Sequence, residues 1–199
     1  MKNGRWLVAS VGFLAAALAA PAAAQDDSGL YLGGSLGYSQ YKDSCKMLIV
    51  PCDGNDTAWR AFAGYQFNRY VALEAGFANL GEVTGSGIFN TGTPGNFSVA
   101  VDEAWDLTAV FLIPVTSRLS GLARVGMYRA RTTIDVSNEG FPDIHEAGTN
   151  SGFSYGAGAE FRLGPIGLRA EWQRYENVGV AATGEDDIDV LSLGLLLRF

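Results

Sequence analysis

The last ten residues of the chain, Val190-Leu191-Ser192-Leu193-Gly194-Leu195-Leu196-Leu197-Arg198-Phe199, indicate the fold. Counted back in twos from Phe199, one set of positions holds only leucine, whereas the other set also holds arginine, glycine and serine. A period of two predicts a β-strand, and about ten tilted residues are enough to cross the hydrocarbon core of a membrane. Because one face of this strand is wholly apolar, it must face either a protein core or lipid.

The amino terminus has the features of an export signal. Two basic residues precede an apolar run from Trp6 to Ala20, and the small residues at 21–24 provide a cleavage site. This is the pattern of a secretory signal peptide. We therefore predict that residues 1–24 are removed and that residues 25–199 form one domain. No later stretch has the roughly 18 uninterrupted apolar residues of a membrane-spanning helix.

Charge and cysteine content narrow the choice of partners. The formal net charge is −7, and removing Lys2 and Arg5 with the signal peptide makes it −9. Such an acidic chain is not expected to bind nucleic acid. The two cysteines, Cys45 and Cys52, lie in a polar stretch of an exported chain and predict a disulfide. The alternative is a metal site, but two thiols with no histidine nearby are an incomplete ligand set, so we expect no metal or cofactor.

Seven further segments show the same alternation as the last ten residues. They are Leu30–Ser39, Trp59–Phe67, Val71–Ala78, Trp105–Ile113, Ala123–Tyr128, Phe153–Phe161 and Leu168–Gln173. The chain is therefore predicted to be all-β, with eight antiparallel strands. The connections alternate between long loops and tight turns. Long loops are expected at 41–56, 82–95, 137–150 and 176–187, and tight turns at 68–70, 114–118 and 164–165. In an up-and-down barrel this order puts every long loop at one rim, as in outer-membrane barrels.

A water-soluble barrel is the alternative fold. Such a barrel turns its apolar residues inward and its polar residues to water. Here the less apolar set is mostly Gly, Ser and Ala with a few charges, which suits a crowded lumen better than a wet surface. The apolar set carries aromatic residues near both strand ends, as expected for the two membrane interfaces. They are Phe67, Phe111, Phe161 and Phe199 at the short-turn end, and Trp59, Phe77, Trp105, Phe153 and Trp172 at the long-loop end. We predict a transmembrane β-barrel.

Two segments resemble a known family. The stretch Gly64-Tyr65-Gln66-Phe67-Asn68-Arg69-Tyr70-Val71-Ala72-Leu73-Glu74-Ala75-Gly76-Phe77 resembles the second hairpin of OmpA-like and OmpX-like outer-membrane barrels. Leu168-Arg169-Ala170-Glu171-Trp172 resembles their seventh strand. The resemblance implies a monomer in the cell outer membrane of a Gram-negative bacterium, surrounded by lipid and lipopolysaccharide. Because the chain stops at the eighth strand, we expect no peptidoglycan-binding domain.

The inward positions of the predicted strands contain a set of charged residues. They are Arg60, Glu74, Asp106, Arg124, Glu160, Arg169 and Glu171. An eight-stranded barrel is only about wide enough for its own side chains, so these charges must pair with one another. A polar plug in the lumen is therefore predicted. The resemblance also implies a gate, in which Glu74 exchanges Arg169 for a second cation. The family's lysine is replaced by Val110 here, and Arg124 is the candidate substitute.

Three functions remain open at this point. The first is a structural and surface protein with a plugged lumen, the second a narrow pore for small solutes, and the third an adhesin whose external loops bind a host or matrix ligand. Enzymatic activity is not expected. Enzymes that resemble the lipid A deacylase use a Ser-His-acid arrangement, whereas the single histidine, His145, falls in the predicted loop 137–150.

Four arginines fall near the predicted short-turn end. They are Arg69, Arg118, Arg162 and Arg198. We interpret them as contacts for phospholipid phosphates, with Arg198 also able to pair with Asp26 or Asp27.

The terminal pattern Leu193, Leu195, Leu197 and Phe199 resembles the signal that the barrel-assembly machinery recognises in this family. Deletion of Phe199 should therefore lower the amount of protein in the outer membrane. The variant Phe161→Ala, which changes an aromatic residue inside the chain, serves as the control. Normal outer-membrane levels of the deletion variant, measured after membrane fractionation, would contradict this assignment.

Overall fold

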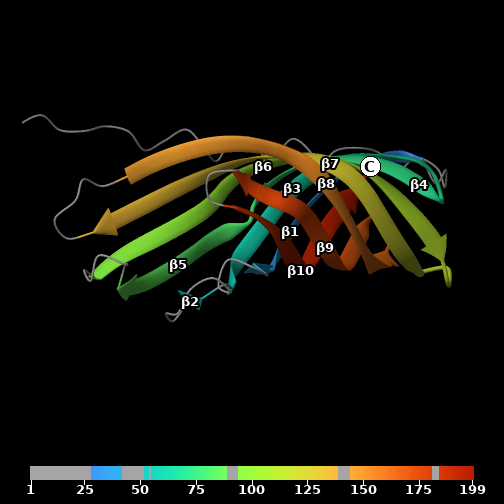
Figure 1. The fold of residues 1–199 in the computed structure, drawn as a ribbon. Coiled ribbons are helices and arrows are strands. Elements are labelled where there is room, and N and C mark those ends of the chain that lie inside the picture. The colour runs from blue at the N-terminus through green and yellow to red at the C-terminus, as the bar shows by residue number, and fades with distance from the viewer. Residues whose placement is uncertain (1–27, 42–51, 54, 89–93, 139–143, 181–183) are drawn as a thin grey trace, which may run out of the picture.

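The computed structural model describes residues 28–41, 52–53, 55–88, 94–138, 144–180 and 184–199 (Figure 1). Ten strands form within these ranges. They are β1 (Gly29–Tyr41), β2 (Cys52–Asp53), β3 (Asn55–Asn68), β4 (Val71–Asn79), β5 (Gly81–Ile88), β6 (Pro94–Pro114), β7 (Leu119–Asn138), β8 (Ile144–Leu163), β9 (Ile166–Val180) and β10 (Gly184–Arg198). No helix among the described residues is long and apolar enough to cross a membrane.

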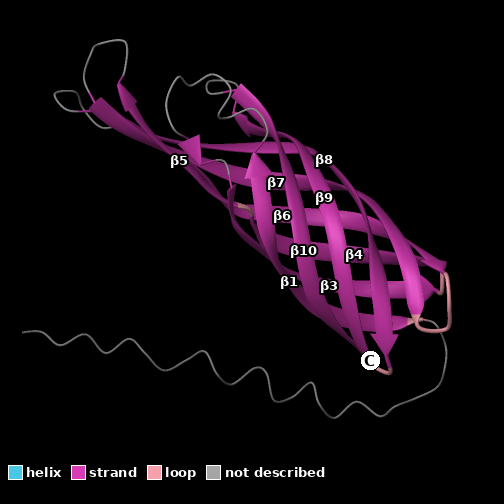
Figure 2. Ribbon diagram, turned by 90° about the horizontal axis from the view of Figure 1, so that it is seen from below, coloured by secondary structure: helices cyan, strands magenta, loops and turns pink. Residues whose placement is uncertain are grey.

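Eight of these strands close into an antiparallel barrel. The order is β6-β4-β3-β1-β10-β9-β8-β7, and β7 pairs again with β6. The first and last strands close the ring, with β1 pairing β10 from Tyr31 opposite Arg198 to Tyr41 opposite Ile188. Figure 2 shows the strands inclined around the barrel, with the carboxyl terminus at the end that carries the short turns. The predicted fold is confirmed, and the terminal stretch is its closing strand.

The two remaining strands extend one side of the barrel. One of them, β5, continues the barrel strand β4. Both β4 and β5 pair with β6, so β4 and β5 together act as one strand that is interrupted at Leu80. At the interruption Gly81 has φ 88°, a left-handed conformation that glycine adopts without steric cost. Its N–H donates to Oδ1 of Asn79 at 2.9 Å. The short strand β2 then pairs with the free edge of β5.

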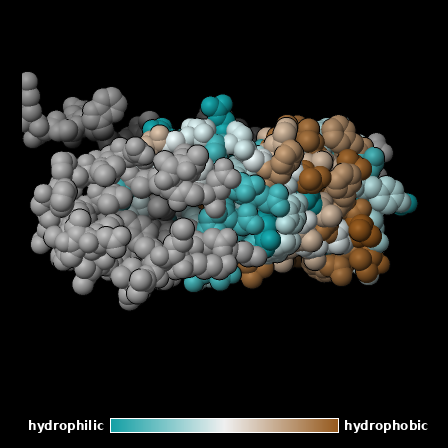
Figure 3. Space-filling model, in the orientation of Figure 1, coloured by the Kyte–Doolittle hydropathy of each residue, from teal (hydrophilic) through white to brown (hydrophobic). Residues whose placement is uncertain are grey.

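The two faces of each barrel strand differ as predicted. On the outside, Leu193 is 72% exposed and Leu36 is 67% exposed, whereas Leu196 and Tyr31 on the opposite faces are buried. Figure 3 shows the resulting apolar band toward the short-turn end, next to a polar zone. An apolar exterior over a buried, partly charged interior is the reverse of a water-soluble barrel.

Exterior aromatic rings pack against one another across neighbouring strands. Phe77 lies between Trp59 and Trp105, with ring centroids 5.6 and 4.8 Å away. On the other side of the barrel, Tyr155 and Trp172 are 5.9 Å apart. These contacts form a row of aromatic residues toward the long-loop end, where the sequence predicts the outer membrane interface.

The three tight turns lie where they were predicted. The β3–β4 turn is held by Asn68, whose Oδ1 accepts from the N–H groups of Tyr70 at 2.8 Å and Val71 at 3.1 Å. The β6–β7 turn uses Thr116, whose Oγ1 accepts from the N–H of Leu119 at 2.9 Å. Short polar side chains that satisfy turn N–H groups explain why these connections need so few residues.

The predicted long loops were too long. Much of 82–95 is strand in β5 and β6, 137–150 is mostly strand in β7 and β8, and 176–187 is largely strand in β9 and β10. His145 accordingly lies in β8, opposite Asp135, and not in a loop. The prediction relied on apolar alternation, which a strand needs only where lipid faces it. Beyond the membrane, ladder hydrogen bonds continue without that pattern.

Two expectations fall outside the described residues. The signal peptide at 1–24 is one of them. The Cys45–Cys52 disulfide is the other, because Cys45 lies outside the described ranges and the side chain of Cys52 is not described.

The lipid-facing surface generates a stability prediction. Leu193→Lys should lower the free energy of unfolding by about 2–4 kcal/mol, the cost of a cation near the middle of the bilayer on a barrel wall. Thr57→Lys is the matched control, because Thr57 is an outward residue two positions beyond Trp59 on β3. Urea titrations of the barrel refolded in lipid vesicles measure both. Equal losses for the two variants would show that the apolar band does not face lipid.

Candidate functional site

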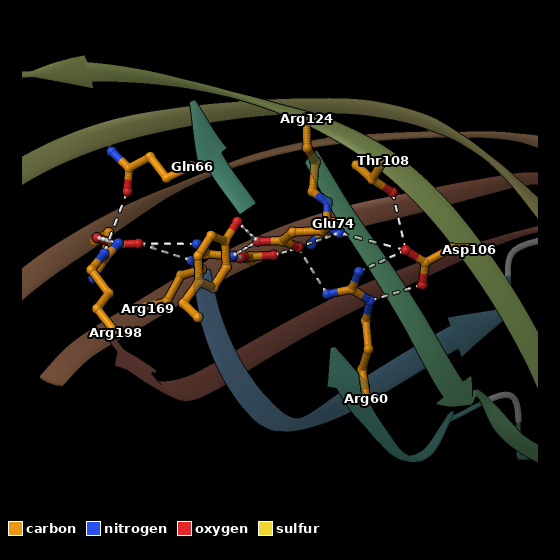
Figure 4. A network of polar contacts seen from close by, with 11 residues as sticks. Arg60, Gln66, Glu74, Asp106, Thr108, Arg124, Arg169 and Arg198 are labelled. Atoms are coloured by element: carbon orange, nitrogen blue, oxygen red, sulfur yellow. Dashed lines mark hydrogen bonds and ion pairs between the residues drawn. The ribbon is translucent and has the colours of Figure 1, made fainter. Parts of the chain in front are cut away.

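The seven inward charges predicted from the sequence all lie buried in the lumen. They are Arg60 on β3, Glu74 on β4, Asp106 on β6, Arg124 on β7, Glu160 on β8, and Arg169 and Glu171 on β9. Strands that are distant in sequence point these side chains toward the same central space, where they form one connected set (Figure 4). We call this set, together with the residues it recruits below, the lumen charge network.

Glu74 is the centre of the network. It is 0% exposed and lies within ion-pair distance of three arginines. Arg169 Nη1 donates to its Oε1 at 2.5 Å, while Arg60 Nη1 and Arg124 Nη2 donate to its Oε2 at 3.2 and 3.3 Å. The hydroxyl of Tyr31 also donates to Oε1, at 2.9 Å. One buried carboxylate therefore accepts four hydrogen bonds, three of them from cations.

A two-point ion pair forms one arm of the network. Arg60 donates to Asp106 through Nε at 2.8 Å and Nη2 at 2.6 Å, the planar fork geometry that favours arginine. Thr108 Oγ1 donates to the same carboxylate at 3.0 Å. Gly76 makes the pair possible, since a Cβ at that position would lie 2.6 Å from both Arg60 and Asp106.

The other arm runs toward the periplasmic mouth. Glu171 pairs with Arg124 and with Arg169 Nη1, the latter at 3.1 Å. Glu160 accepts from Arg169 Nη2 at 3.0 Å and from Arg198 Nη2 at 2.6 Å. Arg198 Nε reaches Oε1 of Gln66 at 3.4 Å. The ion pairs thus link β4, where Glu74 lies, to the closing strand β10 (Figure 4).

Arg198 and Tyr31 are members that sequence reasoning missed. We interpreted Arg198 as a lipid-phosphate contact, but its side chain is only 16% exposed and pairs with Glu160 inside the barrel. Its position on the Gly194 and Leu196 face of β10 was the available signal. With Arg198 the network holds four arginines and four carboxylates, so the formal charges cancel. The aromatic ring of Tyr31 lies against Gly64. A Cβ at position 64 would be only 2.3 Å from Cζ of that ring.

The other predicted contacts at the short-turn end have different surroundings. Arg69 and Arg118 are exposed, and the guanidinium of Arg69 lies 4.9 Å from the ring of Tyr70. Asp26 and Asp27 lie outside the described residues.

An apolar layer fills the lumen on the long-loop side of the network. Its large members are Tyr41, Leu80, Val101, Tyr128, Tyr175, Val178 and Ile188, all buried. We call it the outer apolar layer. The rings of Tyr128 and Tyr175 meet edge to face at 5.4 Å. The sequence did not predict this layer, because most of these residues lie outside the segments recognised as strands.

Tyrosine hydroxyls in the outer apolar layer are satisfied by backbone carbonyls. Tyr41 donates to the carbonyls of Leu80 at 3.3 Å and Gly81 at 3.0 Å. Tyr128 donates to the carbonyl of Glu176 at 2.6 Å. These bonds tie the layer to the strand backbones and leave the tyrosine rings to fill space.

A second apolar group lies on the periplasmic side of Glu74. It consists of Tyr31, Phe62, Ala72, Val110, Leu112, Leu122 and Leu196, all buried. The guanidinium groups of Arg60 and Arg169 lie over the ring of Phe62, 4.8 and 5.3 Å from its centroid. Val110, the position of the family's lysine, is part of this apolar group. Arg124 already binds Glu74, so it is not a free partner that awaits exchange.

A small cavity is lined by residues of both the network and the outer apolar layer. Its lining includes Arg60, Arg124, Glu171, Gln173 and Tyr175. Among the described residues there is no group of three or more His, Cys, Asp or Glu side chains arranged to hold a metal ion.

Comparisons with known proteins agree with this architecture. The family described as "Outer membrane protein beta-barrel domain" matches residues 9–199. Outer membrane protein A of Shigella flexneri and of Escherichia coli O157:H7 are each 34% identical over 96% of the chain. The chain spans about half the length of these relatives, 53% in both cases. The crystal structure of Neisserial surface protein A covers 86% of this chain and 98% of its own, with a TM-score of 0.53 and 16% identity, a likeness of fold.

The place of Arg198 in the network can be tested by charge removal. Arg198→Gln should lower the free energy of unfolding by about 1–3 kcal/mol, because it takes a charged partner from buried Glu160. Arg118→Gln, on the exposed β6–β7 turn, removes the same charge and should stay within about 0.5 kcal/mol of the parent. Urea unfolding in lipid vesicles measures both. Equal stability of the two variants would show that the ion pair between Arg198 and Glu160 does not stabilise the barrel.

Proposed function

This chain belongs to the outer membrane protein β-barrel family and lies in the cell outer membrane, and we propose that it is a structural and surface protein there, with a lumen closed to ions. In this proposal the signal peptide at 1–24 directs export, and the barrel-assembly machinery recognises β10 through Leu193, Leu195, Leu197 and Phe199. The mature barrel acts as a monomer in contact with lipid and lipopolysaccharide.

The network around Glu74 is the observation that carries the proposal. Its four carboxylates all have arginine partners, and three arginines converge on Glu74 at once. Releasing one arginine leaves a charge without its partner in a water-poor interior, which costs several kcal/mol. A network held this way favours a permanent plug over a pore that opens readily.

The outer apolar layer supports the same conclusion. An ion needs a continuous polar or wet path, and an apolar constriction opposes conduction by excluding water. Tyr128, Tyr175 and Ile188 are buried within this layer, beyond the charged residues. Opening the ion pairs alone would therefore leave the long-loop half of the lumen closed.

A narrow pore for small solutes is the second candidate. The cavity beside Arg60, Arg124 and Glu171 favours it, because polar groups line a space next to the network. If that cavity connects with water on both sides of the membrane, breaking the ion pairs of Glu74 would open a path for ions through the lumen. The pore hypothesis and the plug hypothesis therefore predict different ion conductance for a variant that lacks the Glu74 carboxylate.

A surface role is the other part of the proposal. Strands β6, β7 and β8 continue well beyond the aromatic row at Trp105 and Tyr155, so their hairpins stand above the membrane (Figure 2). Hairpins held by ladder hydrogen bonds offer a firm surface for a host or matrix ligand.

Conductance measurements in planar bilayers distinguish the plug hypothesis from the pore hypothesis. The refolded barrel should give no unitary currents, and Glu74→Ala should give none either, because the outer apolar layer still closes the lumen. Thr57→Ala, on the outer surface, is the control for reconstitution. Heat-modifiable gel mobility verifies that each variant is folded.

Two results would decide against the plug. Regular unitary currents from the parent barrel would show an open path through the network. Currents that appear only in Glu74→Ala would show that the ion pairs, and not the outer apolar layer, close the lumen, as the pore hypothesis requires.

A further inference from the structure

Two arginines project from the outer wall just beyond the aromatic row. Arg129 and Arg131 lie on β7, two positions apart, and both are exposed. Arg129 follows exposed Met127 on the same face of the strand, and its partner on β6 is exposed Trp105. Side chains two apart on a strand are separated by about 7 Å and point the same way. The pair therefore lies side by side at the outer membrane interface.

These arginines differ from the third outward arginine of this region. Arg174 donates to Asp189 at 2.7 and 2.8 Å, and its charge is thereby matched within the barrel. Neither Arg129 nor Arg131 has an ion-pair partner among the described residues. In a chain with a net charge of −7, these two adjacent guanidinium groups, with the one carboxylate of Glu103 opposite Arg131, form a local site with a net positive charge.

Hydroxyl groups complete the site on the neighbouring strand. Ser151 lies opposite Arg129 and Thr149 lies opposite Arg131 across the β7–β8 ladder. Both are exposed, and directly opposed side chains on one face are about 5 Å apart. Two guanidinium groups and two hydroxyls thus form a block of hydrogen-bond donors. On the β6 side, the exposed carboxylate of Glu103 lies opposite Arg131.

We propose that Arg129 and Arg131, with Ser151 and Thr149, bind a phosphate group of a phosphorylated glycolipid in the outer leaflet, of the lipid A type. Arginine forks match phosphate oxygens in two-point hydrogen bonds, and hydroxyls supply further donors. The aromatic and apolar side chains of Trp105 and Met127 lie below the arginines, where the acyl chains of the same lipid pass. The site depends on the outer-membrane location and not on whether the lumen conducts.

The position explains why the ligand is a membrane lipid and not a soluble anion. Figure 3 shows a polar zone next to the apolar band, and in a membrane the lipid headgroups would lie at the level of this zone. A soluble phosphate would have only the donors, whereas a lipid anchored in the adjoining band is held next to them at high effective concentration. Glu103 adds one carboxylate, and a divalent cation between Glu103 and the lipid is the competing mode of binding.

The test compares lipid A retention by paired variants. The full barrel is refolded in vesicles that contain phosphatidylethanolamine with either bis-phosphorylated or dephosphorylated lipid A, extracted in mild detergent, and analysed by native mass spectrometry. Arg129→Gln/Arg131→Gln is compared with Arg174→Gln, which removes an outward arginine whose charge Asp189 already neutralises. We expect the first variant to retain roughly tenfold less bis-phosphorylated lipid A than the parent, the loss of about one strong contact. The control variant should match the parent.

Each other outcome overturns the proposal. Equal retention of bis-phosphorylated and dephosphorylated lipid A would show that acyl contacts alone hold the lipid. Equal retention by the two arginine variants would place the site elsewhere. Loss of retention by the parent on addition of EDTA would assign binding to a bridging cation at Glu103. Folding of every variant is verified by heat-modifiable mobility, so a misfolded barrel is not counted as lost binding.

Discussion

Buried charge in a narrow space is the constraint on which this barrel depends. Eight strands enclose a lumen that is filled by its own side chains, and water cannot solvate an ion there as bulk solvent does. Glu74 is fully buried, and its charge is tolerable only because Arg60, Arg124 and Arg169 donate to it together. Each of those arginines in turn binds another carboxylate. With Arg198 included, the four arginines and four carboxylates of the network have no net formal charge. The ion pairs therefore determine which residues can line the wall.

The wall is adapted to this network in two ways. Glycines lie where the largest inward groups need room, as Gly76 does beside Arg60 and Gly64 does beside Tyr31. The closing strand also contributes to it through Arg198, which binds Glu160. The same strand that presents leucines to lipid thus carries the last positive charge of the interior. The strand that closes the barrel therefore also completes the charge balance of its lumen.

Alternation of residues made the faces of the strands predictable, and with them the seven inward charges, the turns and the apolar exterior. It could not show which carboxylate binds which arginine, because pairing depends on register across strands that are distant in sequence. It also assigned Arg198 to lipid phosphates, since an arginine near a chain end has two plausible polar surroundings. The outer apolar layer was missed for a third reason. Leu80, Val101 and Ile188 lie toward the long-loop end, where the strands persist without an alternating apolar face.

A double-mutant cycle between Glu74 and Arg169 tests the central claim most directly. The parent, Glu74→Gln, Arg169→Gln and the combined variant are refolded in lipid vesicles, and the free energy of unfolding of each is measured by urea titration. If the two side chains stabilise the barrel through their ion pair, the combined loss will be smaller than the sum of the single losses by about 1–3 kcal/mol. Strictly additive losses would mean that the charges share the lumen without holding it together, and would contradict this account.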